Sequence, residues 1–197
     1  MNPNPVTVYG LTGGIGMGKS TAAEILVRRG VVVVDTDQLA RQLVVSGQPA
    51  LVEIQREFGS KFITSDRQLD RSALARLVFT DAVARQKLEA ILHPRIRKGW
   101  QAQVDTWRQE GRRAAVVVIP LLFETAAEAH FDKVLCLACS AATQHTRLRA
   151  RGWSPEQIAQ RISAQWPVEK KMNRADYVVW TEGSVAALAE QLERIVA

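Results

Sequence analysis

The glycine-rich stretch from Gly13 to Ser20 constrains this chain more strongly than any other part of its sequence. It reads Gly-Gly-Ile-Gly-Met-Gly-Lys-Ser and fits the pattern G-x-x-x-x-G-K-[ST]. Glycines allow the backbone to turn tightly and to bring bare amide groups against a ligand. A helix that begins directly after such a loop adds its N-terminal amides to the same pocket. The pattern therefore predicts a loop that binds phosphate.

The residues on either side of this loop supply the context that the pattern requires. Residues 6–11 form a short β-prone run before the loop. After it, Ala22, Ile25 and Leu26 have helical spacing, and Gly30 is well placed to end that helix. A strand, a glycine loop and a helix in this order predict a nucleotide-binding site.

Within the loop, we expect different residue types to have different roles. Backbone amides would hold the phosphate groups of ATP, Lys19 would reach the terminal phosphates, and the hydroxyl of Ser20 would ligate Mg²⁺. The predicted nucleotide-binding residues are Gly13, Gly14, Ile15, Gly16, Met17, Gly18, Lys19, Ser20 and Thr21.

Two aspartates follow the next predicted strand. Residues 31–34 are four valines, a run typical of a strand buried on both faces of a parallel sheet, and Asp35-Thr36-Asp37 comes directly after them. Ligands of open α/β sheets bind at the carboxyl ends of the strands, so the glycine loop and these carboxylates are expected at the same edge. One carboxylate could accept a proton from a hydroxyl that attacks the γ-phosphate or hold Mg²⁺ through water, and the other could cap a helix. The spacing leaves open which aspartate does which.

Residues 38–109 show helical patterns and no convincing strand. Apolar residues recur at helical spacing, turns are predicted at residues 47–49 and 66–68, and His93-Pro94 is expected to interrupt the helical pattern. We therefore expect a helical insertion that leaves the sheet directly after the candidate base. Such an insertion is well placed to hold the second substrate.

The rest of the chain completes the predicted sheet. Further strands are expected at residues 115–119, 134–138 and 177–180, with a helix from about residue 142 and another across residues 185–195. Ser154 and Pro155 have the order of a helix N-cap followed by a proline in the first turn. Strands that alternate with helices predict a doubly wound parallel sheet.

Positive charge is concentrated between the fourth and fifth predicted strands. The chain has a formal net charge of +6 at pH 7, and residues 147–174 include seven basic and two acidic residues. Arg147 and Arg151 are four residues apart, so on a helix they would share a face and could contact phosphate. This segment is expected to be a lid that closes over ATP. A solvated helical face remains the alternative for Arg149, Lys170 and Lys171.

The sequence indicates a cytoplasmic protein without a membrane span. Its first residues lack a signal-peptide pattern, and its longest apolar run, residues 114–123, is too short to cross a bilayer. Cys136 and Cys139 have C-x-x-C spacing on a predicted buried strand, where their thiols would point to opposite faces. We therefore expect core cysteines rather than a redox or metal site.

Other classes of nucleotide-binding protein are less well supported. GTPases need a D-x-x-G motif, and no aspartate here has a glycine three residues later. The segment from Asn173 to Asp176 imitates the guanine-reading N-K-x-D motif, but it precedes a strand instead of following one. A motor or transport ATPase would usually end a strand with an acidic residue, which the strand at 115–119 lacks. A small kinase with a helical acceptor domain and a lid fits better.

Beyond the glycine loop, several short motifs occur in an order that is specific to one family. On these motifs the chain resembles dephospho-coenzyme A kinases from Gly10 to about Ser184, which is almost its whole length. The motifs are Gly10 to Gly16 leading into Gly18 to Thr21, Asp35-Thr36-Asp37 with Ala40-Arg41, Phe58-Gly59, Leu69-Asp70-Arg71, Val78-Phe79, Leu92-His93-Pro94 with Ile96, Pro120-Leu121-Leu122-Phe123-Glu124, Arg161-Ile162 with Gln165, and Ala175-Asp176.

The resemblance implies a reaction and a fold. ATP would transfer its γ-phosphate to the 3′-hydroxyl of the ribose of dephospho-coenzyme A, the last step of coenzyme A synthesis. The expected fold is the α/β P-loop kinase fold, a five-stranded parallel sheet flanked by helices, with a helical acceptor-binding insertion and a helical lid. The nucleotide-binding core would comprise residues 1–37, 111–141 and 175–197, the dephospho-coenzyme A-binding insertion residues 38–110, and the lid residues 142–174.

The resemblance also implies catalytic roles. Asp37, the second aspartate of its motif, would contact the substrate as the general base. Lys19 together with Arg147 or Arg151 would stabilise the phosphoryl group during transfer.

For the acceptor, the resemblance implies that Leu121 and Leu122 line its pocket and that His93 lies near it. His93 is equally well explained as part of a His-Pro pair that ends a helix.

One departure from the family pattern concerns the nucleotide, because Thr181 stands where the family often has asparagine after the last strand. This difference puts an adenine contact by that side chain in question. A second departure is Asp66-Arg67, where the family has an Asp-Gly turn; this is expected to be a surface change.

Two alternatives differ in what they bind. Another small-molecule kinase, acting on a nucleoside or a sugar acid, would not be expected to carry Leu92-His93-Pro94 in this form. A nucleic-acid-binding protein would use the basic segment, which lacks regularly interleaved aromatic residues and has only Trp153 and Trp166. We therefore expect dephospho-coenzyme A as the partner, with neither nucleic acid nor membrane, and the oligomeric state stays open.

Overall fold

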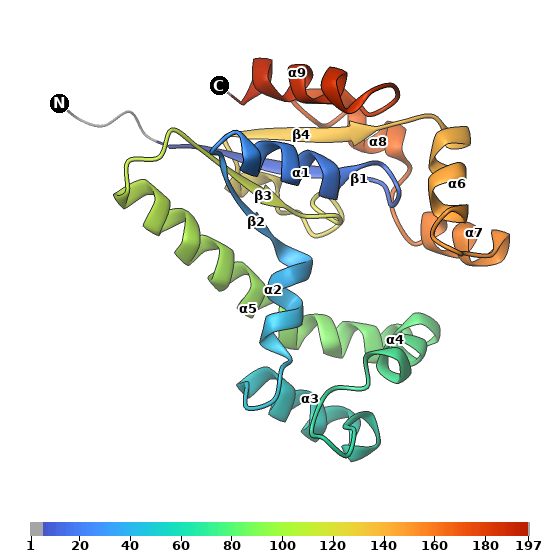
Figure 1. Ribbon diagram of the computed structural model, residues 1–197. Helices are drawn as coiled ribbons and strands as arrows, with labels where there is room; N and C mark the ends of the chain where they lie inside the picture. Colours follow the sequence, from blue (N-terminus) through green and yellow to red (C-terminus); the bar gives the residue numbers. More distant parts are fainter. Residues whose placement is uncertain (1–5, 197) are drawn as a thin grey trace. The chain divides into compact units, whose positions relative to one another are not determined.

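The computed structural model describes residues 6–196, which form two compact units (Figure 1). One unit contains the described residues up to Val34 and those from Val104 onward, and the other is Asp35–Gln103. In chain order the elements are β1 (Thr7–Gly13), α1 (Lys19–Arg28), β2 (Val32–Asp35), α2 (Thr36–Leu43), α3 (Pro49–Phe58), the 3₁₀ helix η1 (Ser60–Phe62), α4 (Arg71–Thr80), α5 (Ala82–Gln109), β3 (Ala114–Val118), the 3₁₀ helix η2 (Glu128–His130), β4 (Lys133–Ala138), α6 (Ala141–Arg149), α7 (Pro155–Ser163), α8 (Val168–Met172), β5 (Tyr177–Trp180) and α9 (Val185–Ile195).

The five strands form one sheet in the order β2-β3-β1-β4-β5. The central strand β1 pairs in parallel with β3 and β4, and β4 pairs in parallel with β5. The register places Leu11 of β1 opposite Val118 on one side and Leu135 on the other. The five-stranded parallel sheet predicted from the sequence is thereby confirmed, and the glycine loop leaves it at the carboxyl end of the central strand.

The main core lies between the sheet and the helices α1 and α9. Leu11, Leu135 and Leu137 are fully buried there, and they pack with Leu26 of α1 and Leu192 of α9. Burying a leucine side chain stabilises the fold by about 1.5–3 kcal/mol. This core holds β1 and α1, the two elements on either side of the glycine loop.

A smaller core lies on the opposite face of β1. Gly10, the neighbour of Leu11, lies on this face, because successive residues of a strand alternate between its two faces. A Cβ atom on Gly10 would lie 2.6 Å from Leu122 Cδ1 and 2.7 Å from Phe131 Cδ2, so only glycine lets these side chains approach the strand. Leu122 is fully buried in this cluster together with Phe123 and Val134. The segment after β3 is thereby fixed against the sheet.

The amino end of β4 is anchored by Asp176, the aspartate of the Ala175-Asp176 motif. Its Oδ2 accepts a hydrogen bond from Val134 N at 2.8 Å, and its Oδ1 lies 3.2 Å from Lys133 Nζ. The amide of Val134 holds the pKa of the Asp176 carboxyl below its usual value, and Lys133 lowers it further. A structural role therefore accounts for this motif.

The smaller unit is helical and has a core of its own. Ala50 and Ile54 of α3, Leu74 of α4 and Ile91 of α5 are buried together with Phe62 of η1. The helices α2, α4 and α5 each begin after an aspartate whose carboxylate accepts from amides of the first turn. α5 spans 28 residues, and within residues 6–196 no helix combines the length and the apolar character needed to cross a membrane.

The prediction that His93-Pro94 interrupts the helix is wrong, because Pro94 lies inside the continuous helix α5. A proline in a helix removes one amide donor and crowds the preceding turn, which weakens the helix locally. Here Arg95 Nη1 donates to the carbonyl of Ile91 at 2.6 Å, and Arg95 also pairs with Glu53 of α3. These contacts and the burial of Ile91 offset the local cost of the proline.

Both cysteines are free and buried, as expected for core residues. Burial raises the pKa of the Cys136 thiol to about 11, and it also raises the pKa of the Cys139 thiol above its ordinary value. A thiol with a raised pKa carries less thiolate at a given pH, and only the thiolate is a good nucleophile.

We therefore expect neither thiol to react with Ellman's reagent in the folded protein at pH 8. Both should react quickly once the chain is unfolded in guanidinium chloride, because exposure restores their ordinary pKa values. Absorbance of the released thionitrobenzoate measures both rates. Rapid reaction of two thiols in the folded protein would contradict this burial.

Candidate functional site

The glycine loop has the backbone conformation of a phosphate cradle. Gly13 has a φ of 141°, and a Cβ atom there would lie 2.4 Å from the carbonyl oxygen of Leu137 on the neighbouring strand. Gly18 has a φ of 86° at the N-cap of α1, in the left-handed region that favours glycine. Both fixed glycines of the sequence pattern are thus required by the shape of the loop.

The N-terminus of α1 offers backbone amides to an anion. The N-cap Gly18 has no side chain, so no side-chain cap accepts from the first turn of α1. This turn also contains no acidic residue, and Ser20 and Thr21 at its surface are exposed. Helix N-termini with unsatisfied amides favour negative charge, so the site suits a phosphate group.

Lys19 extends back across the loop that precedes it. Its Nζ donates to the carbonyl of Gly13 at 2.7 Å and to that of Gly14 at 2.9 Å. The ammonium group therefore lies over the concave backbone of the loop, beside the amides of the α1 N-terminus. This is the arrangement expected of a lysine that contacts bound phosphate.

Ile15, in the middle of the loop, is held by two glutamines. Its amide donates to Gln165 Oε1 at 2.8 Å, and its carbonyl accepts from Gln144 Nε2 at 2.7 Å. Sequence reasoning quoted Gln165 only as part of a motif and missed Gln144. Their distance from Ile15 in the chain leaves no local spacing signal for either contact.

Arg147 is positioned against the loop by Thr181. Its guanidinium donates to the side chain of Thr181 at 2.8 Å and also to the carbonyl of Thr181, and it lies 3.5 Å from the carbonyl of Gly16. Thr181 is buried and also contacts Ala138. The residue that departs from the family pattern therefore holds Arg147, and it packs against the loop, because a Cβ atom on Gly18 would lie 3.3 Å from Thr181 Cγ2.

Arg151 does not share a helical face with Arg147. Helix α6 ends at Arg149, and Arg151 is exposed in the turn that follows. The (i, i+4) argument for the pair is therefore wrong for Arg151, because the helix ends between the two residues. Ser154, by contrast, caps α7 as expected, and its side chain and that of Gln157 form a capping box.

Of the two aspartates at the end of β2 and the start of α2, Asp35 caps a helix. Its Oδ1 accepts from the amide of Asp37 at 2.8 Å, at the N-cap of α2. Asp37 lies in the first turn of α2 and is exposed. The cap therefore occupies one oxygen of Asp35, while Asp37 presents its carboxylate from the first turn of the helix.

The two leucines predicted to line the acceptor pocket have different environments. Leu122 is fully buried in the smaller core, whereas Leu121 is partly exposed. The segment that carries them is tied down by Lys171, whose Nζ donates to Pro120 O at 2.9 Å and lies 2.8 Å from Glu124 Oε1. The solvated helical face that the sequence left open for Lys171 is excluded, because its side chain is 0% exposed.

The predicted site residues fall in both units. The glycine loop, Lys19, Arg147 and the two leucines belong to the unit that contains β1, and there Arg147 contacts the loop. Asp37 and the exposed His93 of α5 belong to the helical unit Asp35–Gln103. The contacts of each group of residues are therefore described within the unit to which it belongs.

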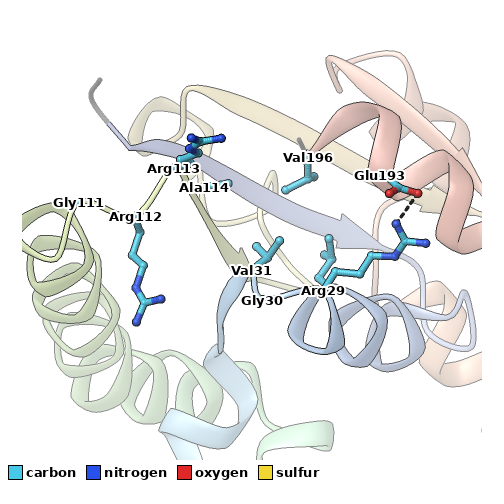
Figure 2. A pocket seen from close by; sticks show the side chains of 10 residues that line it. Arg29, Gly30, Val31, Gly111, Arg112, Arg113, Ala114, Glu193 and Val196 are labelled. Atoms are coloured by element: carbon cyan, nitrogen blue, oxygen red, sulfur yellow. Dashed lines mark ion pairs between the residues drawn. The ribbon is translucent and has the colours of Figure 1, made fainter. Parts of the chain in front are cut away.

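A cavity of about 640 Å³ lies at the other end of the strands. It is lined by the end of α1, the start of β3 and the end of α9, and Figure 2 shows Arg29 paired with Glu193 beside it. Arg112 of the same lining pairs with Glu110 at 2.9 Å. Ligands of parallel α/β sheets bind at the carboxyl ends of the strands, so this cavity is not the phosphate site.

Comparisons with known proteins cover nearly the whole chain. A family model described as dephospho-CoA kinase matches residues 7–187. The dephospho-CoA kinase of Anaeromyxobacter dehalogenans is 43% identical over 191 residues, which cover 96% of this chain and 90% of that protein. The crystal structure of TT1252 from Thermus thermophilus is 34% identical, with a TM-score of 0.85 and coverage of 98% and 97% of the two chains. The structure of the dephospho-CoA kinase from Campylobacter jejuni is 25% identical, with a TM-score of 0.70 and coverage of 95% and 94%.

Proposed function

The chain belongs to the dephospho-CoA kinase family, and we propose that it transfers the γ-phosphate of ATP to the 3′-hydroxyl of the ribose of dephospho-coenzyme A. The products are coenzyme A and ADP. The observation that carries this proposal on the nucleotide side is the glycine loop, with Lys19 lying over it and an uncapped helix N-terminus beside it. The family match over residues 7–187 supports the choice of acceptor.

The nucleotide is bound through its phosphates. Backbone amides within residues 13–21 surround the phosphate oxygens, whereas the amide of Ile15 stays with Gln165. The ammonium of Lys19 exchanges the loop carbonyls for the β- and γ-phosphates. Transfer builds charge on the equatorial oxygens of the phosphoryl group, and prearranged donors stabilise that charge. Arg147 and Arg151 are the proposed donors from residues 142–174, which act as the lid.

Mg²⁺ is proposed to enter with the nucleotide. Among the residues that the structure describes, no group of three or more His, Cys, Asp or Glu side chains could hold a metal ion. Mg²⁺ in phosphoryl-transfer sites typically takes phosphate oxygens, waters and only one or two protein ligands. A single hydroxyl beside the bound phosphates is therefore enough to complete its coordination. Ser20, exposed at the start of α1, would supply the protein ligand. The ion would neutralise charge on the phosphates.

Asp37 is proposed as the general base. The acceptor hydroxyl must lose its proton during transfer, and an exposed carboxylate in the first turn of α2, directly after the strand β2, suits this task. The cap at Asp35 supports the choice of Asp37, because the cap already uses an oxygen of Asp35. The helical segment 38–110 is proposed to bind dephospho-coenzyme A with His93, and the partly exposed Leu121 offers more accessible surface to it than the buried Leu122.

A panel of acceptors tests the proposed function. We expect ADP release from MgATP with dephospho-coenzyme A and none above background with adenosine, a deoxynucleoside or gluconate. A coupled assay for ADP measures the rate in each case. Turnover with one of the other acceptors would leave the nucleotide site intact and refute the proposed substrate.

The location and other partners remain predictions of the sequence. We propose a cytoplasmic enzyme that acts on small molecules and binds neither nucleic acid nor membrane. The two free thiols are typical of a reducing compartment.

A further inference from the structure

We infer that Gln144 and Gln165 position the glycine loop for nucleotide binding by holding both backbone polar groups of Ile15. The inference rests on the proposed function, because it concerns the ATP side of the same reaction. Gln144 donates to the carbonyl of Ile15 at 2.7 Å, and Gln165 accepts from its amide at 2.8 Å. The two side chains therefore fix the peptide groups on both sides of one loop residue.

The loop needs such support because its neighbouring residues restrict the backbone little. Ile15 lies between Gly14 and Gly16, and Gly16 has a φ of 77°. Glycine has more conformational freedom than any other residue, and ordering it on binding costs free energy. A loop that is held in its binding conformation before the nucleotide arrives avoids part of that cost. Holding Ile15 therefore favours nucleotide affinity.

Gln144 is fixed by the packing of α6 against the loop. Its side chain is buried, and a Cβ atom on Gly14 would lie 3.3 Å from its Nε2. One turn further along α6, Leu148 is fully buried, and a Cβ atom on Gly16 would lie 3.0 Å from its Cγ. Side chains of α6 therefore pack closely against Gly14 and Gly16 and leave little room for a larger residue at either position.

Gln165 is fixed by a buried ion pair next to it. The amide of Trp166 donates to Glu124 Oε1 at 2.9 Å, and the same oxygen lies 2.8 Å from the Nζ of the buried Lys171. The backbone next to Gln165 is therefore anchored to the segment after β3. Both glutamines lie in residues 142–174, so the proposed lid holds the glycine loop through them.

The two hydrogen bonds have opposite requirements, which gives a matched test. Position 144 must donate to a carbonyl, whereas position 165 must accept from an amide. Glutamate can accept but, when ionised, cannot donate. Gln165→Glu therefore keeps its hydrogen bond, and Gln144→Glu places a carboxylate against a carbonyl oxygen. Both variants add one negative charge beside the same residue, so their difference isolates the hydrogen bond.

We expect Gln144→Glu to raise the Kd for MgADP at least about tenfold, and Gln165→Glu to raise it far less. Gln160→Glu, at an exposed position of α7, is the control for added charge and should bind MgADP as the parent protein does. Isothermal titration calorimetry measures the three constants. In turnover, the KM for ATP should rise in Gln144→Glu while the KM for the acceptor stays unchanged.

Equal losses in Gln144→Glu and Gln165→Glu would overturn the inference in favour of a simple charge effect, and so would no loss in either. If thermal melting shows that Gln144→Glu does not fold, Gln165→Met against Gln165→Glu applies the same test at a partly exposed position, where only the methionine should lose affinity. MgADP binding requires no acceptor. A protein that follows this binding pattern but does not phosphorylate dephospho-coenzyme A would refute only the proposed function.

Discussion

Replacing Asp37 by asparagine is expected to lower kcat by about a hundredfold to ten-thousandfold, the usual contribution of a general base. Asparagine has nearly the same shape but cannot take the proton of the attacking hydroxyl. MgATP binding should persist, because the phosphates are held by the glycine loop and Lys19. Steady-state turnover with dephospho-coenzyme A and calorimetric binding of a non-hydrolysable ATP analogue measure the two effects separately.

Asp35→Asn is the matched control for this variant. Asparagine caps helices about as well as aspartate, so the hydrogen bond to the amide of Asp37 and the stability of α2 should be retained. We expect this variant to keep most of its kcat. If Asp37→Asn turned over at a near-normal rate while Asp35→Asn was inactive, the base would be Asp35 and the assignment would be wrong.

Replacing Lys171 by methionine is expected to lower the free energy of unfolding by about 3–5 kcal/mol, the range found when one partner of a buried ion pair is removed. The side chain of Lys171 is 0% exposed and that of Glu124 is 14% exposed. Within the described residues, Glu124 Oε2 has no hydrogen-bond partner, so the variant would leave a buried carboxylate with little compensation. Urea denaturation followed by circular dichroism measures the loss.

The double variant Lys171→Met with Glu124→Gln separates the charge effect from lost packing. A neutral glutamine can still accept from the amide of Trp166, so removing both charges should recover much of the stability. If the double variant lost as much stability as the two single variants added together, the result would contradict a buried ion pair. A loss below about 1 kcal/mol for Lys171→Met alone would contradict it as well.

Local sequence patterns were sufficient to predict the sheet and the glycine loop. Four consecutive valines at residues 31–34 and the strand, loop and helix around Gly13 each carry their signal within a few residues. The parallel pairing then follows from the alternation of strands and helices. The structure confirms those predictions. They could be made from the sequence because each depends only on residues that are close together in the chain.

Contacts between distant residues could not be predicted in the same way. Pro94 was expected to interrupt a helix, but the burial of Ile91 and the contacts of Arg95 keep α5 continuous. Gln144 and Gln165 are ordinary polar residues by composition, and only the fold brings them to Ile15. Tertiary contacts decided these positions, as they often override local preference.

The basic segment shows the same limit for charge. From the sequence, Arg147 was predicted to contact phosphate and Lys171 could lie on a solvated face, yet in the structure Lys171 is buried and Arg147 contacts Thr181. Arg174 pairs with Glu128, and Arg161 stacks on Trp153. Because much of this charge is engaged within the protein, the segment gives little support to a broad nucleic-acid-binding surface.

The position of the new phosphate on the product tests the central claim most directly. Purified protein would be incubated with MgATP and dephospho-coenzyme A, and the product examined by ³¹P NMR and by comparison with authentic coenzyme A. A single new phosphomonoester on the 3′-hydroxyl of the ribose is the result that the proposed function predicts. A phosphate at another position, or ADP formed without any phosphorylated acceptor, would contradict it.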